Sequence, residues 1–140
     1  VVGGLHHCIK DMSATFANLG QLVKPGGYLL AVEPNADFFL NRLRMSWYRR
    51  EKWFQEADEA PLRYETLLNL ARPAFDAVSV RYLGGPAYFL ILNSLILRLP
   101  VAAKRLLARL TFLSDDIYNL LPGSSPYPMF ISQWRRRDQR

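Results

Sequence analysis

The sequence predicts an α/β fold, in which helices cover a mainly parallel sheet. Two short apolar segments, residues 1–5 and 28–33, read as buried strands and enclose one amphipathic helical segment. Such a strand–helix–strand unit with short connections folds as a right-handed crossover between parallel strands. Further strand signals at residues 75–83 and 129–134 indicate that the sheet extends beyond this pair.

The helix between the first two strands is predicted from its cap, its apolar stripe and its end. Asp11 is a favourable N-cap residue. Apolar residues recur after it at spacings of four and three, at Met12, Phe16, Leu19 and Leu22. The run Lys24–Gly27 then ends the helix, because proline cannot continue it and glycine adopts the left-handed turn conformation. Pro34 ends the strand that follows.

The rest of the chain is predicted to be mostly helical, apart from the two later strands. Residues 35–60 interleave aromatic and basic side chains and predict one or two helices. A further helix is expected at residues 64–72, where Pro73 closes it. Residues 86–113 carry four basic side chains and no acid, and they predict two helices hinged near Pro100. Their uninterrupted apolar runs are too short to span a bilayer.

Composition indicates one domain and limits the classes of function. Half of the 140 residues are hydrophobic, which suits a packed core. Cys8 is the single cysteine, so an internal disulfide framework is excluded and a reducing, cytoplasmic location is expected. The net charge of +6 is concentrated at residues 42–52 and 135–140. No nucleic-acid-binding motif accompanies these clusters, and we interpret them as solvated faces rather than as sites for phosphate, nucleic acid or membrane.

Several motifs carry a resemblance to a known family. Gly4–His7 places a Leu-His-His run at the end of the first predicted strand. Residues 22–30 read LVKPGGYLL, and Glu33-Pro34 follows them. These motifs resemble the second half of class I S-adenosylmethionine-dependent methyltransferases of the small-molecule type, in which a Leu-Lys-Pro-Gly-Gly turn leads into the fifth strand. Residues 64–80 are similar, more weakly, to the family's next helix and sixth strand, and residues 128–134 to its antiparallel seventh strand.

The resemblance implies that the chain is the C-terminal half of a Rossmann-like methyltransferase domain, with strands four to seven and helical insertions. The expected parts are a strand–helix–strand core (1–34), a substrate-side helical insertion (35–60), a helix and strand (61–85), a helical cap or interface insertion (86–122) and a final strand (126–136). The family's glycine-rich loop after its first strand and the acid that ends its second strand have no counterpart here. We therefore expect strands one to three to lie upstream of Val1, and this fragment to be inactive alone.

The same resemblance implies an enzyme that transfers a methyl group from S-adenosylmethionine to a small, apolar or lipid-like acceptor. Ligands of open α/β sheets bind beyond the carboxyl ends of the strands. The residues expected to border the cofactor are Gly4, Leu5 and His6. The residues expected to border the substrate are Glu33, Pro34, Asn35 and Trp47.

Several of these residues have a second interpretation. His6 or His7 either acts as a catalytic general base or shapes the pocket through hydrogen bonds at the strand end. No metal site is expected, because neighbouring residues of an extended segment point to opposite faces. Glu33 accepts a hydrogen bond either from the substrate or from a nearby backbone amide. Trp47 either roofs a substrate pocket or belongs to the core.

Residues 86–113 also have two interpretations. They form either a helical cap whose apolar face covers the sheet and active site, or a basic, apolar surface that makes peripheral contact with a membrane. Two other classes of function remain open, namely a nucleotide-dependent oxidoreductase and a non-enzymatic membrane- or partner-binding module. The methyl acceptor and the oligomeric state are not specified by the sequence, and nucleic acid is not an expected partner.

Overall fold

The protein is described by a computed structural model, which covers residues 3–52, 54–55, 59–93 and 97–138. The chain divides into two compact units. The first unit comprises Val1–Ala36, Gln55–Arg81 and Met129–Arg140, and the second comprises Asp37–Phe54 and Tyr82–Pro128. The first unit holds the sheet, and the second is mainly helical.

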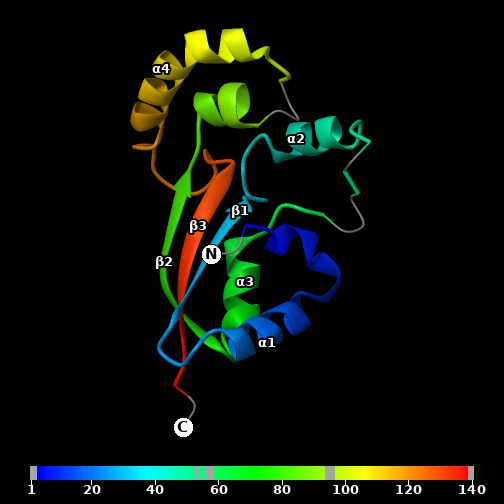
Figure 1. The fold of residues 1–140 in the computed structure, drawn as a ribbon, viewed down its shortest axis with the longest axis vertical. Coiled ribbons are helices and arrows are strands. Elements are labelled where there is room, and N and C mark those ends of the chain that lie inside the picture. The colour runs from blue at the N-terminus through cyan, green and yellow to red at the C-terminus, as the bar shows by residue number, and fades with distance from the viewer. Residues whose placement is uncertain (1–2, 53, 56–58, 94–96, 139–140) are drawn as a thin grey trace. The chain divides into compact units, whose positions relative to one another are not determined.

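The sheet has the strand order β1–β3–β2 among the described residues (Figure 1). β1 (Tyr28–Pro34) pairs with β3 (Met129–Arg136) in antiparallel register, beginning with Tyr28 opposite Arg135. β2 (Phe75–Leu83) lies on the other side of β3. The three later predicted strands are therefore confirmed, and so is the antiparallel direction of the last one. Its place between the other two is not evident from the sequence.

One face of the sheet packs against two helices and forms the core of the first unit. α1 (Met12–Leu22) and α3 (Tyr64–Ala71) lie on the same side of the sheet (Figure 1). Side chains alternate along a strand, and the β3 residues that face the helices are fully buried: Phe130, Ser132 and Trp134. The ring of Trp134 lies 6.4 Å from that of Phe16 in α1 and 5.5 Å from that of Tyr64 in α3.

α1 begins where the sequence predicts. The side chain of Asp11 accepts a hydrogen bond from the backbone N–H of Ala14 at 2.9 Å, which satisfies one of the free donors at the helix start. Met12 and Phe16 are buried, whereas Leu22 is 79% exposed. The predicted apolar stripe is therefore buried at its start and open at its end.

The first predicted strand is wrong for its described part, residues 3–5. Leu5–His7 form a 3₁₀ turn instead, and a second turn follows at Ile9–Asp11. The physical reason is the buried carboxylate of Glu33, which accepts the backbone N–H groups that a strand would use for pairing. Residues 1–2 lie outside the described residues. The expected parallel pair of neighbouring strands is thus not formed by the part of the chain that the structure describes.

The second unit contains α2 (Asn41–Tyr48), a π-helical segment (Tyr88–Leu92) and α4 (Val101–Tyr118). Helical structure is thus present in both segments where helices were predicted, although the part before Pro100 is only a short π-helical segment, and α4 begins directly after Pro100, where a hinge was predicted. Parts of both predicted insertions, residues 53, 56–58 and 94–96, lie outside the described residues. Within the described ranges, the helices are too short or too polar to cross a membrane.

Candidate functional site

Glu33 organises the chain segment that carries the two histidines. It lies near the carboxyl end of β1 and is fully buried. Its Oε1 accepts the backbone N–H groups of Gly4 at 3.2 Å and Leu5 at 2.9 Å, and its Oε2 accepts that of His6 at 3.1 Å. A buried carboxylate is costly unless it is compensated in this way. The structure thus shows the second interpretation of Glu33, in which it binds backbone amides of the same chain.

The same carboxylate also orients the side chain of His6. Its Oε2 lies 2.7 Å from Nδ1 of the imidazole. A carboxylate oxygen is an acceptor, so this contact pairs it with the tautomer of the imidazole that carries its proton on Nδ1. In the neutral ring Nε2 then keeps its lone pair, which is the arrangement of a carboxylate-oriented general base. The His6 side chain is 23% exposed, so a ligand can reach this ring.

The residues predicted to border the cofactor differ in their accessibility. Gly4 is partly exposed and presents backbone without a side chain. Leu5 is 1% exposed, so its side chain belongs to the core and contributes packing under the turn. Gly4 and His6 therefore form the accessible part of this surface, and Leu5 supports it from below.

His7 is held by a different acid. Its Nδ1 lies 3.3 Å from Oε1 of Glu59, and its side chain is 52% exposed. The rings of His6 and His7 lie side by side, with their centroids 4.1 Å apart. This proximity arises because the segment is a 3₁₀ turn, whereas an extended chain would separate the two rings. Within the described residues, His, Cys, Asp and Glu side chains form no group that could hold a metal ion.

Pro34 and Asn35 have structural contacts in the first unit. Pro34 pairs with Met129 of β3, and its carbonyl accepts the backbone N–H of Leu62 at 2.8 Å. Asn35 is fully buried and forms an isolated parallel bridge with Leu62. These two predicted substrate residues therefore join β1 to the segment that precedes α3.

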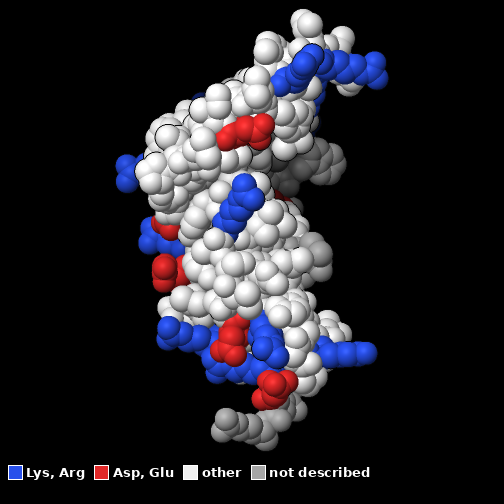
Figure 2. All heavy atoms as spheres, turned by 90° about the vertical axis from the view of Figure 1, so that its left-hand side faces the viewer, with Lys and Arg blue, Asp and Glu red and all other residues white. Residues whose placement is uncertain are grey.

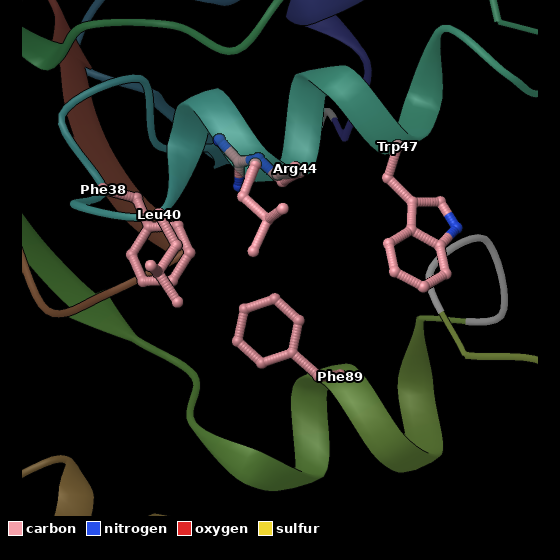
Figure 3. A pocket seen from close by; sticks show the side chains of 6 residues that line it. Phe38, Leu40, Arg44, Trp47 and Phe89 are labelled. Atoms are coloured by element: carbon pink, nitrogen blue, oxygen red, sulfur yellow. The ribbon is translucent and has the colours of Figure 1, made fainter.

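Trp47 belongs to the second unit and lines an apolar pocket of about 130 Å³. Figure 3 shows Phe89 extending from the π-helical segment toward α2, with Phe38 and Leu40 on one side and Trp47 on the other. The lining residues are Phe38, Leu40, Leu43, Arg44, Trp47 and Phe89. An apolar cavity of about 150 Å³ is large enough for a benzene ring, so this pocket suits a small aromatic group or a short alkyl segment.

Arg44, which lines this pocket, and Tyr48 of the same helix are both buried and hydrogen-bonded. The guanidinium of Arg44, 2% exposed, donates to Oδ1 of Asn41 and, at 2.8 Å, to the carbonyl of Pro128. Burial lowers the pKa of Arg44. Nδ2 of Asn93 donates to the hydroxyl of Tyr48 at 2.7 Å, and burial raises the pKa of that hydroxyl, with a further contribution from neighbouring Tyr88. The hydroxyl of Tyr48 therefore keeps its proton at physiological pH while it accepts the hydrogen bond from Asn93.

Sequence reasoning identified Trp47 but missed the rest of this pocket. Leu40, Leu43, Arg44 and Trp47 recur at spacings of three, one and three, which places them on one face of a helix. This spacing is a signal that was available. Phe89 had no such signal, because it comes from a segment more than forty residues away in the chain.

The basic cluster at the C-terminus is largely engaged within the first unit. Nε of Arg136 donates to the carbonyl of Gly20 at 2.7 Å, and its Nη1 donates to that of Ala74 at 2.8 Å. Arg137 pairs with Asp76 across the end of the sheet. At the lower end of Figure 2, red and blue side chains are interspersed. Arg136 and Arg137 are thus held by groups of the first unit itself.

Comparison with known proteins gives no family: neither a protein-family model nor a curated protein sequence matches this chain. The function is therefore inferred from the geometry above together with the resemblance of the motifs.

Proposed function

We propose that this chain is part of an S-adenosylmethionine-dependent methyltransferase, in which His6 and Gly4 border the reaction site and the acceptor is a small, apolar or lipid-like molecule. The observation that carries the proposal is the carboxylate of Glu33, which holds a Leu-His-His turn at the carboxyl end of β1. Strand ends of this kind are where open α/β sheets bind their ligands. The antiparallel last strand agrees with the same family.

The accessible residues fit one rim of such a cofactor site. Gly4 allows a ligand to approach the backbone closely, and His6 offers an imidazole edge. When bound, S-adenosylmethionine supplies an electrophilic methyl group. On this proposal Nε2 of His6 accepts the proton that a hydroxyl or amine acceptor releases, and Glu33 stabilises the resulting imidazolium through Nδ1.

The pocket of the second unit supports an apolar acceptor. Aromatic and aliphatic side chains form most of its lining, and the guanidinium of Arg44 is held by groups of the protein itself. A site of this composition favours a ligand through apolar contact rather than through charge. We therefore assign Trp47 and Phe89 to binding of a small apolar group within the second unit.

The proposal is tested by calorimetric titration of the natural full-length protein with S-adenosylhomocysteine, and separately with a nicotinamide dinucleotide. We expect S-adenosylhomocysteine to bind. In His6→Ala its dissociation constant should rise by about tenfold, which corresponds to a loss of about 1.4 kcal/mol of binding free energy. The matched control is His7→Ala, which removes a neighbouring imidazole and should leave the affinity unchanged. Absence of binding by the unmodified protein, or a preference for the dinucleotide, would contradict the proposal.

A further inference from the structure

The outer face of α4 is apolar, although it is in contact with solvent. Leu106, Leu110, Leu113 and Ile117 recur at spacings of four, three and four, and they therefore form one stripe along the helix. Their exposed fractions are 80%, 67%, 60% and 69%. Contiguous exposed apolar residues of this kind mark interaction sites more often than isolated ones do.

The orientation of α4 is fixed by polar contacts on its opposite face. Asp115 accepts the backbone N–H groups of Gly85 at 3.2 Å and Ala87 at 2.8 Å. Thr111 is buried, and its hydroxyl donates to backbone carbonyls of its own helix. Turning the leucine stripe inward would break the hydrogen bonds of Asp115 and bury its charge. The exposure of the stripe is therefore a property of how the helix is anchored.

The charge beside the stripe is mainly positive. Arg105 and Arg109 are both exposed and lie along one flank of the stripe. Lys104 lies on the opposite side of the helix and donates to the carbonyl of Ile91, and Arg98, before the helix, pairs with Glu51. Arg105 and Arg109 therefore carry the positive charge beside the stripe, and the exposed acid Asp116 lies on the same flank. In Figure 2 the upper part of the molecular face is mostly white, and blue side chains border it at the top. An apolar stripe with basic flanks is the pattern of helices that lie in a membrane interface.

We propose that α4 docks on an anionic phospholipid surface, with its leucine stripe inserted between the headgroups and with Arg105 and Arg109 at the level of the phosphates. The helix lies in the plane of the surface, since the stripe occupies only one side of it. From Leu106 to Ile117 it extends about 17 Å at 1.5 Å per residue. The exposed pair Arg105 and Arg109 favours an anionic surface as partner, and the net charge of +6 opposes association between copies of this chain.

The test is flotation of the 140-residue chain with vesicles of two compositions: phosphatidylcholine alone, and an equal mixture of phosphatidylcholine and phosphatidylglycerol. We expect binding to the mixed vesicles, weaker binding to phosphatidylcholine, and release as the salt concentration rises to about 0.5 M. The double variant Leu110→Glu with Leu113→Glu should weaken binding to mixed vesicles by at least about tenfold. The control is Val101→Glu, on the same helix and 66% exposed but on another side, which should bind within about threefold of the unmodified chain.

Charge is tested separately from insertion. Arg105→Gln with Arg109→Gln should reduce the preference for the mixed vesicles and weaken the salt dependence. The control is Arg72→Gln with Arg81→Gln, which removes the same charge from exposed positions of the first unit. This variant should retain both the preference for mixed vesicles and the salt dependence of binding. Far-ultraviolet circular dichroism verifies that each variant is folded. Failure of the unmodified chain to bind mixed vesicles would overturn the proposal. It would also be overturned if the chain formed a dimer that the stripe substitutions dissociate, while those substitutions left vesicle binding unchanged. Neither outcome bears on binding of S-adenosylhomocysteine.

Discussion

Glu33 shows how one side chain determines the conformation of a distant segment. Its two oxygens accept three consecutive backbone N–H groups and the imidazole of His6, although the residues lie 27 to 29 positions apart in the chain. The carboxylate is fully buried, so water does not replace a lost hydrogen bond. The turn, and with it the direction of the imidazole, therefore depends on the charge of this residue.

We predict that Glu33→Gln lowers the free energy of unfolding by about 2–4 kcal/mol. The side-chain amide of glutamine replaces one carboxylate oxygen by an NH₂ group, which then faces backbone N–H donors and leaves a buried polar group without a hydrogen bond. Urea denaturation measures the change, and faster hydrogen exchange at Gly4 to His6 locates it. The matched control is Asp76→Asn, which makes the same chemical change at an exposed ion pair with Arg137 and should cost less than about 1 kcal/mol. Equal effects of the two substitutions would show that Glu33 does not hold the turn.

Tyr48 gives the second unit a predictable response to alkaline pH. Its pKa is raised first by burial and then by Tyr88. Above the ordinary tyrosine pKa of about 10 the unfolded chain loses this proton while the folded chain keeps it, so stability falls as pH rises, by at most about 1.4 kcal/mol per pH unit.

Tyr48→Phe should remove this contribution and make the decline between about pH 10 and 11 shallower, since phenylalanine does not titrate. The measurement is urea denaturation at several pH values, with the exposed residue Tyr28 as control in Tyr28→Phe. A variant that declines as steeply as the unmodified protein would contradict the assignment of this proton to Tyr48.

The elements differ in how much of them the sequence predicts. α1 was predictable because Asp11, the stripe after it and the proline–glycine turn are local signals. The strand expected before it fails because the donors of Gly4, Leu5 and His6 are captured by Glu33, a long-range contact without a local signature. The leucine stripe of α4 is exposed because Asp115 anchors the opposite side, and a role of residues 86–113 as a cap stays a prediction.

The candidate site shows the same division between local and long-range information. His6 and Trp47 were identifiable from motif and composition. The partner acids Glu33 and Glu59, and the pocket residue Phe89, take their roles from contacts that only the folded chain makes.

Anchoring of α4 also depends on the absence of a side chain at Gly85. A Cβ at this position would lie 2.8 Å from Oδ1 of Asp115 and 2.9 Å from Cγ of Tyr118, both on α4. We predict that Gly85→Ala destabilises the second unit by about 1–3 kcal/mol, because the helix must move away from the loop. Hydrogen exchange along α4 should become faster.

Gly3→Ala is the matched control for this substitution, because its Cβ would lie 3.9 Å from the nearest atom, the carbonyl oxygen of Val32. It should leave exchange along α4 unchanged. Unaltered exchange in Gly85→Ala itself would show that close packing at this loop does not hold the helix.

At the scale of the whole molecule, the two units carry different parts of the proposed function. The first unit holds the turn with His6, oriented by a buried acid. The second unit holds the apolar pocket and the exposed face of α4. On our proposal the first unit contributes proton transfer and a cofactor rim, and the second unit by itself contributes a pocket for a small apolar group and a face that contacts a lipid surface.

The most direct test of the central claim is photochemical labelling of the natural full-length protein with radioactive S-adenosylmethionine, followed by tryptic mapping. Trypsin cleaves after Lys10, so Gly4 and His6 fall within the peptide that ends there. The account predicts label in this peptide, with excess S-adenosylhomocysteine preventing it and His6→Ala reducing it. Label that is absent from the peptide ending at Lys10, or that persists in the presence of the competitor, would contradict the account.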